Sequence, residues 1–150
     1  MPSPSPRQAL IALKARLAAT GIPLVECVSP NGLLDGGSIR LNRGYSVKPK
    51  KLKWDKNRRA SRLAGGRVSL VFAVSIGYVL RPADGIDAVD EPLTDIDNIM
   101  ATLYEPDTPL TGGTAYALYI SDAVFEYHDG GAYLIVRFDV SPTFNMPLVP

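Results

Sequence analysis

The sequence has only one cysteine, Cys27, and one histidine, His128, in 150 residues. A lone cysteine forms neither an internal disulfide nor a cysteine-based zinc site, which agrees with folding in a reducing compartment. His128 lies beside a turn, without a second histidine or cysteine nearby and without a G-x-S-x-G or H-E-x-x-H motif in the chain. These absences argue against a metalloenzyme and a serine hydrolase. We expect no enzymatic activity, no catalytic residue, no metal and no cofactor.

Long apolar runs are also missing. The longest apolar-rich stretch, residues 68–80, contains two serines and a glycine and is shorter than the ~20 residues that cross a bilayer. Basic side chains interrupt the apolar part of residues 1–21, so these residues lack the order of a secretory signal. We therefore expect no membrane span and folding in the cytoplasm.

The net charge is only +1, but charges of opposite sign are separated along the chain. Residues 40–67 contain eleven basic residues and one acidic residue, whereas residues 84–139 contain twelve acidic residues and one basic residue. Such segments can meet within one subunit or head to tail between subunits, and the basic segment can also meet a polyanion.

Two helices are predicted from apolar spacing. The first covers residues 5–20, where Ser5 and Gln8 form a capping box. The second follows Thr94 as its N-cap and ends before Pro106. In each helix the apolar side chains gather on one face, so each is expected to pack on another layer of the fold.

Alternating apolar residues predict strands at residues 24–28, 68–81, 115–127 and 132–140, the last two joined by a tight turn at Asp129-Gly130. The strand at 68–81 is apolar on one face and partly apolar on the other, so we expect a central strand covered on both faces. Adjacent strands with separate helices favour one α+β domain over residues 1–150, a mostly antiparallel sheet flanked by two helices. The expected core contains Leu13, Leu17, Leu70, Phe72, Val74, Ile76, Ile99 and Leu103.

Residues 43–67 contain few apolar side chains, and these follow neither helical nor strand spacing. We therefore predict a long basic loop, which in a compact domain is expected to be functional or to become ordered on binding. Residues 141–150 contain three prolines and are predicted to form an extended C-terminal arm.

Trp54 lies among the lysines and arginines of the predicted basic loop. This mixture suits phosphate contacts with one stacking platform, but contact with an acidic protein neighbour and a plain solvated loop remain open. The candidate interaction residues, with either a partner subunit or DNA, are Lys48, Lys50, Lys51, Lys53, Trp54, Lys56, Arg58, Arg59 and Arg62.

The order of the predicted elements can be compared with the order in known protein families. An amphipathic N-terminal helix and a strand precede a long insertion, the strand GRVSLVFAVSIGYVLRP, the short helix DIDNIMATLYEP and the hairpin AYALYISDAVFEYHDGGAYLIVRFDVSP. This arrangement resembles the tail terminator proteins of long-tailed bacteriophages, over roughly residues 7–140.

The resemblance implies an α+β virion subunit, assembled in the host cytoplasm, that forms a hexameric ring on the last ring of the tail tube. Such a ring stops tube polymerisation, contacts the tail tube protein on one side and a neck or head-closure protein on the other, and lets DNA pass. It implies no catalytic residue. The residues leave two other readings open: a head-closure or connector protein of the neck, and a nucleic-acid-binding module that uses the basic loop.

Overall fold

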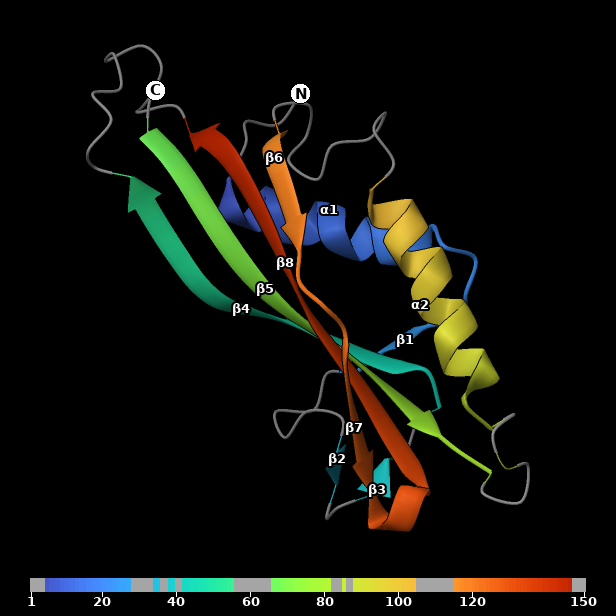
Figure 1. Cartoon of the computed structure of the whole chain (residues 1–150). Helices are drawn as coiled ribbons and strands as arrows, with labels where there is room; N and C mark the ends of the chain where they lie inside the picture. The colour runs from blue at the N-terminus through green and yellow to red at the C-terminus, as the bar shows by residue number, and fades with distance from the viewer. Residues whose placement is uncertain are drawn as a thin grey trace.

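The computed structural model describes residues 5–27, 34–35, 38–39, 42–55, 66–81, 85, 88–104 and 115–146. They form one α+β domain with two helices and a six-stranded, mostly antiparallel sheet (Figure 1), as the sequence predicts. The elements in chain order are α1 (Pro6–Ala18), β1 (Val25–Glu26), β2 (Leu34–Asp35), β3 (Ser38–Ile39), β4 (Gly44–Asp55), β5 (Gly66–Val79), α2 (Asp90–Leu103), β6 (Ala115–Ile120), β7 (Val124–His128) and β8 (Tyr133–Met146).

The main sheet has the strand order β1-β4-β5-β8-β6, and β7 also pairs with β8. β1 runs parallel to β4, and every other pair in this sheet is antiparallel. β6 and β7 follow each other along the same edge of β8, so the predicted strand at 115–127 is in fact two strands separated by residues 121–123. β2 and β3 form a separate small hairpin.

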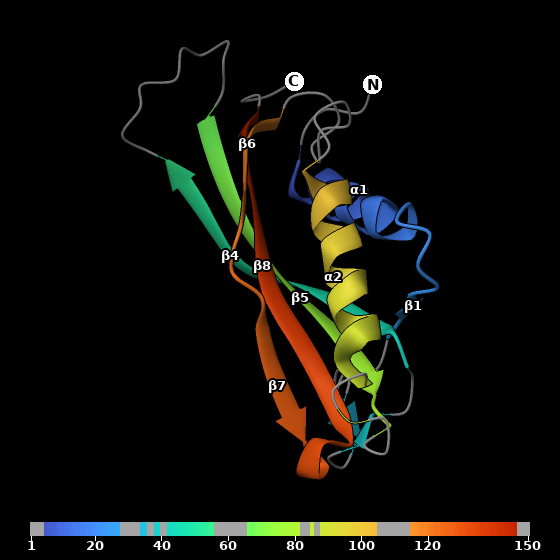
Figure 2. The same ribbon diagram turned by 45° about the vertical axis from the view of Figure 1, so that its right-hand side comes forward.

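Both helices cover the same face of the sheet (Figure 2), which we call the helix face. The eight core residues predicted from the sequence all belong to one buried cluster between this face and the helices. Arg16 on α1 is also buried, although its spacing places it away from the centre of the apolar stripe. Its Nη1 donates to the carbonyl of Thr102 at 2.5 Å, and a cation at this end of α2 complements the helix dipole.

The second face of the sheet, which we call the open face, carries neither helix. Ser69, Val71 and Ala73 of β5 are only half-buried there, so the expectation that β5 is covered on both faces is wrong for this half of the strand. At the other end of β5, where β3 contacts it, Gly77 of β5 and its partner Ile135 of β8 are both buried. β5 is nevertheless central, since β4 and β8 flank it.

Strand β4 replaces much of the predicted basic loop. Residues 44–55 pair with β5, and residues 66–67 belong to β5, so the loop prediction is wrong for these positions. The physical reason is a β-bulge between Pro49 and Lys51, which shifts the register by one residue. The apolar alternation that starts at Tyr45 and Val47 is therefore displaced by one position where it resumes at Leu52. As a result, the sequence shows no regular period of two over this strand. Residues 56–65 lie outside the described residues.

The predicted C-terminal arm is also part of the sheet over residues 141–146, which continue β8; residues 147–150 lie outside the described residues. The β5–β8 pairing is interrupted at Pro142, since it is present at Phe72–Val140 and resumes only at Ser69–Thr143. This interruption accommodates the proline. A proline lacks the N–H that a central ladder position requires.

The ends of the helices agree only in part with the capping signals in the sequence. The Oγ of Ser5 accepts from the N–H of Gln8 at 3.1 Å, which confirms the start of α1. α2 instead begins at Asp90, so the prediction of Thr94 as its N-cap is wrong. The turn between β7 and β8 has positive φ at Asp129 and Gly130, 51° and 63°, as the Asp-Gly pair predicts.

Candidate interaction surface on strand β4

β4 is an edge strand over most of its length. One side pairs with β5 throughout, whereas the other pairs with β1 only at Gly44 and Tyr45. Within the described parts of the chain, no strand lies on the outer side of β4 from Ser46 to Asp55. Such an edge offers N–H and C=O groups to another strand, and lysines, a proline and a bulge are the means by which natural sheets restrict that pairing.

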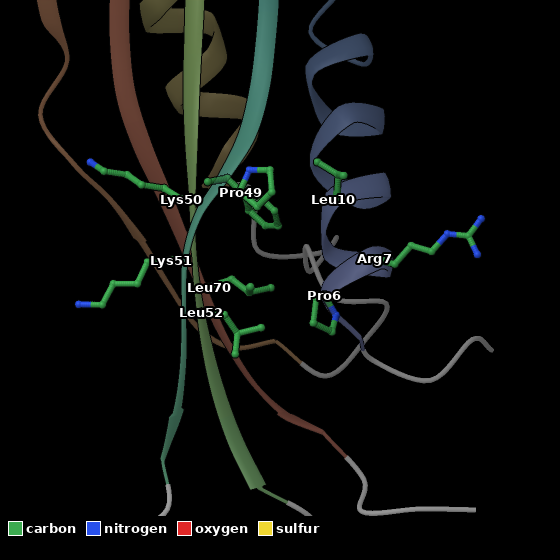
Figure 3. A pocket seen from close by; sticks show the side chains of 9 residues that line it. Pro6, Arg7, Leu10, Pro49, Lys50, Lys51, Leu52 and Leu70 are labelled. Carbon is green, nitrogen blue, oxygen red and sulfur yellow. The ribbon is translucent and has the colours of Figure 1, made fainter. Parts of the chain in front are cut away.

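Four lysines, which we call the lysine row, project from this edge. The register of β4 against β5 puts Lys48, Lys51 and Lys53 on the open face, and all are exposed. Lys50 lies at the bulge, and its Nζ is 3.2 Å from Oδ2 of Asp139 on β8. Figure 3 shows Lys50 and Lys51 pointing away from α1. The sequence analysis expects these four lysines in a loop, whereas the structure aligns them along one strand.

Of the remaining predicted interaction residues, the structure describes only Trp54. Trp54 pairs with Val68 in the β4–β5 ladder. Lys56, Arg58, Arg59 and Arg62 lie outside the described residues.

A groove lies on the helix face beside the same strand (Figure 3). It has a volume of about 460 Å³ and separates the N-terminal half of α1 from β4 and β5. Leu70 and Phe72 are buried in it, whereas Leu52 on the edge strand is 52% exposed. The lining residues are Pro6, Arg7, Leu10, Pro49, Lys50, Lys51, Leu52, Leu70 and Phe72. The groove is therefore mainly apolar, with three cationic residues among those that line it.

The opposite edge of the sheet, formed by β6 and β7, has different chemistry. Tyr119, Val124 and Tyr127 are large apolar side chains with exposed fractions of 67%, 55% and 57%. Three acidic residues, which we call the acidic edge, lie on β7 or next to it: Asp122, Glu126 and Asp129. Glu126 accepts from Nε of Arg137 at 2.8 Å, while the other two are exposed.

Arg43, the first cation of the predicted loop, has a structural role instead. Its Nε and Nη2 donate to the two carboxylate oxygens of Asp95 at 3.0 and 3.1 Å, and Nη2 is 3.0 Å from Glu91. The Tyr78 hydroxyl also donates to Asp95, at 2.9 Å. The hydrogen bond to Asp95 raises the pKa of Arg43, and burial together with the Asp95 charge raises the pKa of Tyr78. This network fixes α2 to the end of the sheet.

The spacing of Asp95 and Ile99 in the sequence is a signal for this network. Asp95 lies four residues before Ile99 on α2, and both side chains are buried. Positions i and i+4 share a helix face, so Asp95 belongs to the core-facing side rather than to the solvated first turn. A buried carboxylate requires a partner, and Arg43 supplies the charge.

His128 ends β7, and its Nε2 is 3.8 Å from Oε2 of Glu126. That nitrogen is buried and has no hydrogen-bond partner in the described part of the structure. Across the described ranges, no three side chains of the metal-ligating types gather into a site. Neither described helix has the length and apolar character needed to span a membrane.

The distinctive surface is therefore the basic edge strand, its adjoining groove and the acidic edge across the sheet. No protein-family model matches the sequence, and no curated protein is significantly similar to it.

Proposed function

We propose that this protein is a structural subunit of a bacteriophage virion, of the tail terminator type. Copies of the chain form a ring at the end of the tail tube and join it to the neck. One observation carries the proposal: the two edges of a single sheet have opposite charge, with the lysine row on β4 and the acidic edge beside β7. Unlike surfaces on one molecule favour head-to-tail contacts, which close into a ring when the rotation between subunits permits.

The fold supports this role in a second way. Among the described residues, the helices and their core cover one face of the sheet (Figure 2), while no helix or strand covers the open face around Val71 or the β4 edge beyond Tyr45. The tail tube protein and a neck or head-closure protein are the partners that the role requires. The lysine row is suited to an acidic protein surface and, in a ring, to weak contact with passing DNA.

Size measurement together with electron microscopy tests the proposal. Purified protein is examined by light scattering, and rings are sought by negative staining, alone and with tail tubes. Closed rings of about six subunits on tube ends support the proposal. Rings that bind a portal or head-closure ring but ignore tube ends would instead favour a connector protein of the neck.

A nucleic-acid-binding module is the second candidate, and the observation that favours it is the exposure of Lys48, Lys51 and Lys53 on one face. It requires a monomer that retards DNA in a gel, with affinity that falls steeply as salt rises. Replacing these lysines by serine abolishes retardation under this alternative. A ring that forms without DNA and retards it weakly contradicts the module as the main function.

A further inference from the structure

β6 forms the edge of the main sheet that lies opposite β4. It pairs with β8 on one side, and among the described residues no strand lies on its other side. Figure 1 shows β6 at the same end of the sheet as the C-terminal half of β4. The N–H and C=O groups on the outer side of an edge strand are available to another strand. At this end of the sheet, both outermost strands are therefore free on their outer sides.

The strand registers place β6 level with the lysine row. Through the ladders of β5 and β8, Lys53 is in register with Ala117 of β6, and Pro49 is in register with Ile120. β7 lies further along the sheet, level with residues 44–46, where β1 already pairs with β4. Of the two strands at this edge, β6 is therefore the one that matches the free part of β4 in height.

Strand direction also allows the two edges to pair. β4 is antiparallel to β5, β5 to β8, and β8 to β6, so β6 is antiparallel to β4. A rotation about an axis along the strands brings β6 of one copy beside β4 of the next copy. Such a rotation changes neither the strand directions nor the height of any residue. The new pair is then antiparallel, like nearly all pairs within the sheet.

On the open face, this arrangement puts Tyr119 beside Lys51. Tyr119 pairs with Ser141, which follows the core residue Val140 and so lies on the open face. Lys51 pairs with Val71 on the same face and at the same level. The Tyr119 side chain is 67% exposed within one chain. A lysine ammonium is attracted to the face of a tyrosine ring, so each side chain offers the other a partner.

On the helix face, the next position puts Leu118 beside Leu52. Leu52 is 52% exposed at the rim of the groove, and Leu118 is only partly buried against the core. Directly opposite side chains in an antiparallel pair contact each other. Pairing of the two edges therefore removes apolar surface of both leucines from water.

Charges are complementary where β6 ends. The N–H of Ser121 donates to the carbonyl of Asp139, which is in register with Lys48 through the β5 ladder. Asp122 is the next residue and is exposed. In the paired arrangement, Asp122 of one copy lies within about one residue of the level of Lys48 in the next copy. The acidic edge therefore meets the lysine row at this point.

We propose that β6 of one copy adds to the free edge of β4 in the next copy, with Tyr119 beside Lys51 and Leu118 beside Leu52. This inference rests on the proposed ring and names the contact that builds it. Addition of a strand gains affinity from main-chain hydrogen bonds and specificity from alternate side chains. The lysine row and the rim of the groove provide that specificity, one on each face of the sheet.

The composition of the two strands agrees with this choice of partner. Lysines on the β4 edge repel the same edge of another copy, which disfavours β4–β4 pairing. Residues 115–120 of β6 contain no charged side chain and avoid this repulsion. The same lysines that prevent indiscriminate pairing thus select an uncharged strand that is followed by an acidic residue.

Disulfide formation tests the contact directly. Lys51→Cys and Tyr119→Cys, both at exposed positions, are combined with Cys27→Ser, and the protein is oxidised gently. Opposite residues of an antiparallel pair have Cα atoms about 4.5–5.5 Å apart, which suits a disulfide. We expect a ladder of disulfide-linked species that ends at the ring size. A mixture of the two single-cysteine variants should give dimers but no ladder.

The matched control for this experiment combines Lys51→Cys with Tyr127→Cys in the same background. Tyr127 is also an exposed tyrosine at this edge of the sheet, but it lies on β7. We expect no ladder from this pair, because β7 is level with the other end of β4.

Repulsion gives a second readout. Tyr119→Lys should associate about fivefold more weakly per contact, because like charges directly opposite each other cost about 1 kcal/mol. Adding Lys51→Glu to this variant should restore association, since the pair then has opposite charges. Tyr104→Lys, at an exposed tyrosine that follows α2, should associate normally. Circular dichroism of each variant shows whether the fold is retained.

The outcomes separate this inference from the proposed function. Rings of the Lys51→Cys/Tyr119→Cys variant that form no disulfide ladder overturn the strand-addition contact but leave the ring intact. A ladder from the Tyr127→Cys control, or a disulfide-linked dimer from Lys51→Cys alone, has the same meaning. Wild-type protein that stays monomeric, both at high concentration and on tube ends, contradicts the contact and the proposed function together.

Discussion

Arg43 and Asp95, 52 positions apart in the sequence, form a two-point ion pair that joins the start of β4 to α2. The Asp95 side chain is 3% exposed, whereas that of Arg43 is 24% exposed. The carboxylate therefore depends on Arg43 and Tyr78 in place of water. This assigns one cation of the basic segment to folding and separates it from the lysine row, which faces solvent.

Replacing Arg43 by alanine should destabilise the protein by about 3 kcal/mol or more, because a buried carboxylate loses its charge partner. The measurement is urea unfolding at neutral pH. Arg7→Ala, at an exposed site on α1, is the matched control and should stay within about 0.5 kcal/mol of wild type. A loss below about 1 kcal/mol for Arg43→Ala, within the range of exposed ion pairs, would show that Asp95 is solvated in solution.

Tyr78 predicts an alkaline limit to stability. Its pKa is raised in the folded protein, so above the ordinary tyrosine pKa of about 10 the unfolded chain has lost a proton that the folded chain retains. Its contribution to stability is complete below pH 10 and is lost as pH rises further, at about 1.4 kcal/mol per pH unit. Tyr78→Phe should be less stable at neutral pH yet lose stability less steeply above pH 10. Parallel slopes for the two proteins would contradict the assignment.

Phe72 of β5 and Leu17 of α1 belong to the same buried cluster between the sheet and the helices. Phe72→Ala should cost about 3–5 kcal/mol and Leu17→Ala about 2–5 kcal/mol, because both are buried and leave a cavity. Ile11→Ala provides the control on the same helix as Leu17, since Ile11 is 47% exposed. We expect its effect to be clearly smaller in chemical denaturation; equal losses at positions 11 and 17 would mean that α1 is rotated on the sheet.

Replacing Lys48, Lys51 and Lys53 together by serine should leave the free energy of unfolding within about 0.5 kcal/mol of wild type, because exposed charges contribute little to the stability of a fold. Self-association and docking on tube ends should weaken instead, and the wild-type contact should weaken as salt rises. Circular dichroism and sedimentation distinguish the two effects. Normal assembly by this variant would identify the lysine row as a plain solvated surface.

The sequence predicted those elements whose apolar residues keep a regular period. β5 alternates without interruption, and both helices carry an apolar stripe, so their faces and the shared core were correct. The sequence does not predict β4, because the bulge after Pro49 breaks the period of two and the other positions of the strand are rich in lysine. The sequence does not predict the start of α2, because Val89 at its N-cap makes no side-chain hydrogen bond and is not a typical capping residue.

The candidate surface was predictable in composition but not in arrangement. Clustering of lysines is visible along the chain, whereas the groove joins Leu10 of α1 to Leu52 and Leu70 of two strands far away in sequence. Likewise, Lys50 meets Asp139 only through the register of three strands. Such relationships depend on tertiary packing, which local spacing does not encode.

The proposed ring depends on contact between the lysine row of one copy and the acidic edge of the next. Sedimentation velocity tests this contact when wild type is compared with a Lys51→Glu/Lys53→Glu variant, an Asp122→Lys/Glu126→Lys variant and their equimolar mixture. We predict a closed ring of about six subunits for wild type and for the mixture, and slow-sedimenting monomer for either variant alone. Monomer in all four samples would contradict the ring, and rings in both variants alone would show that these charges do not build it.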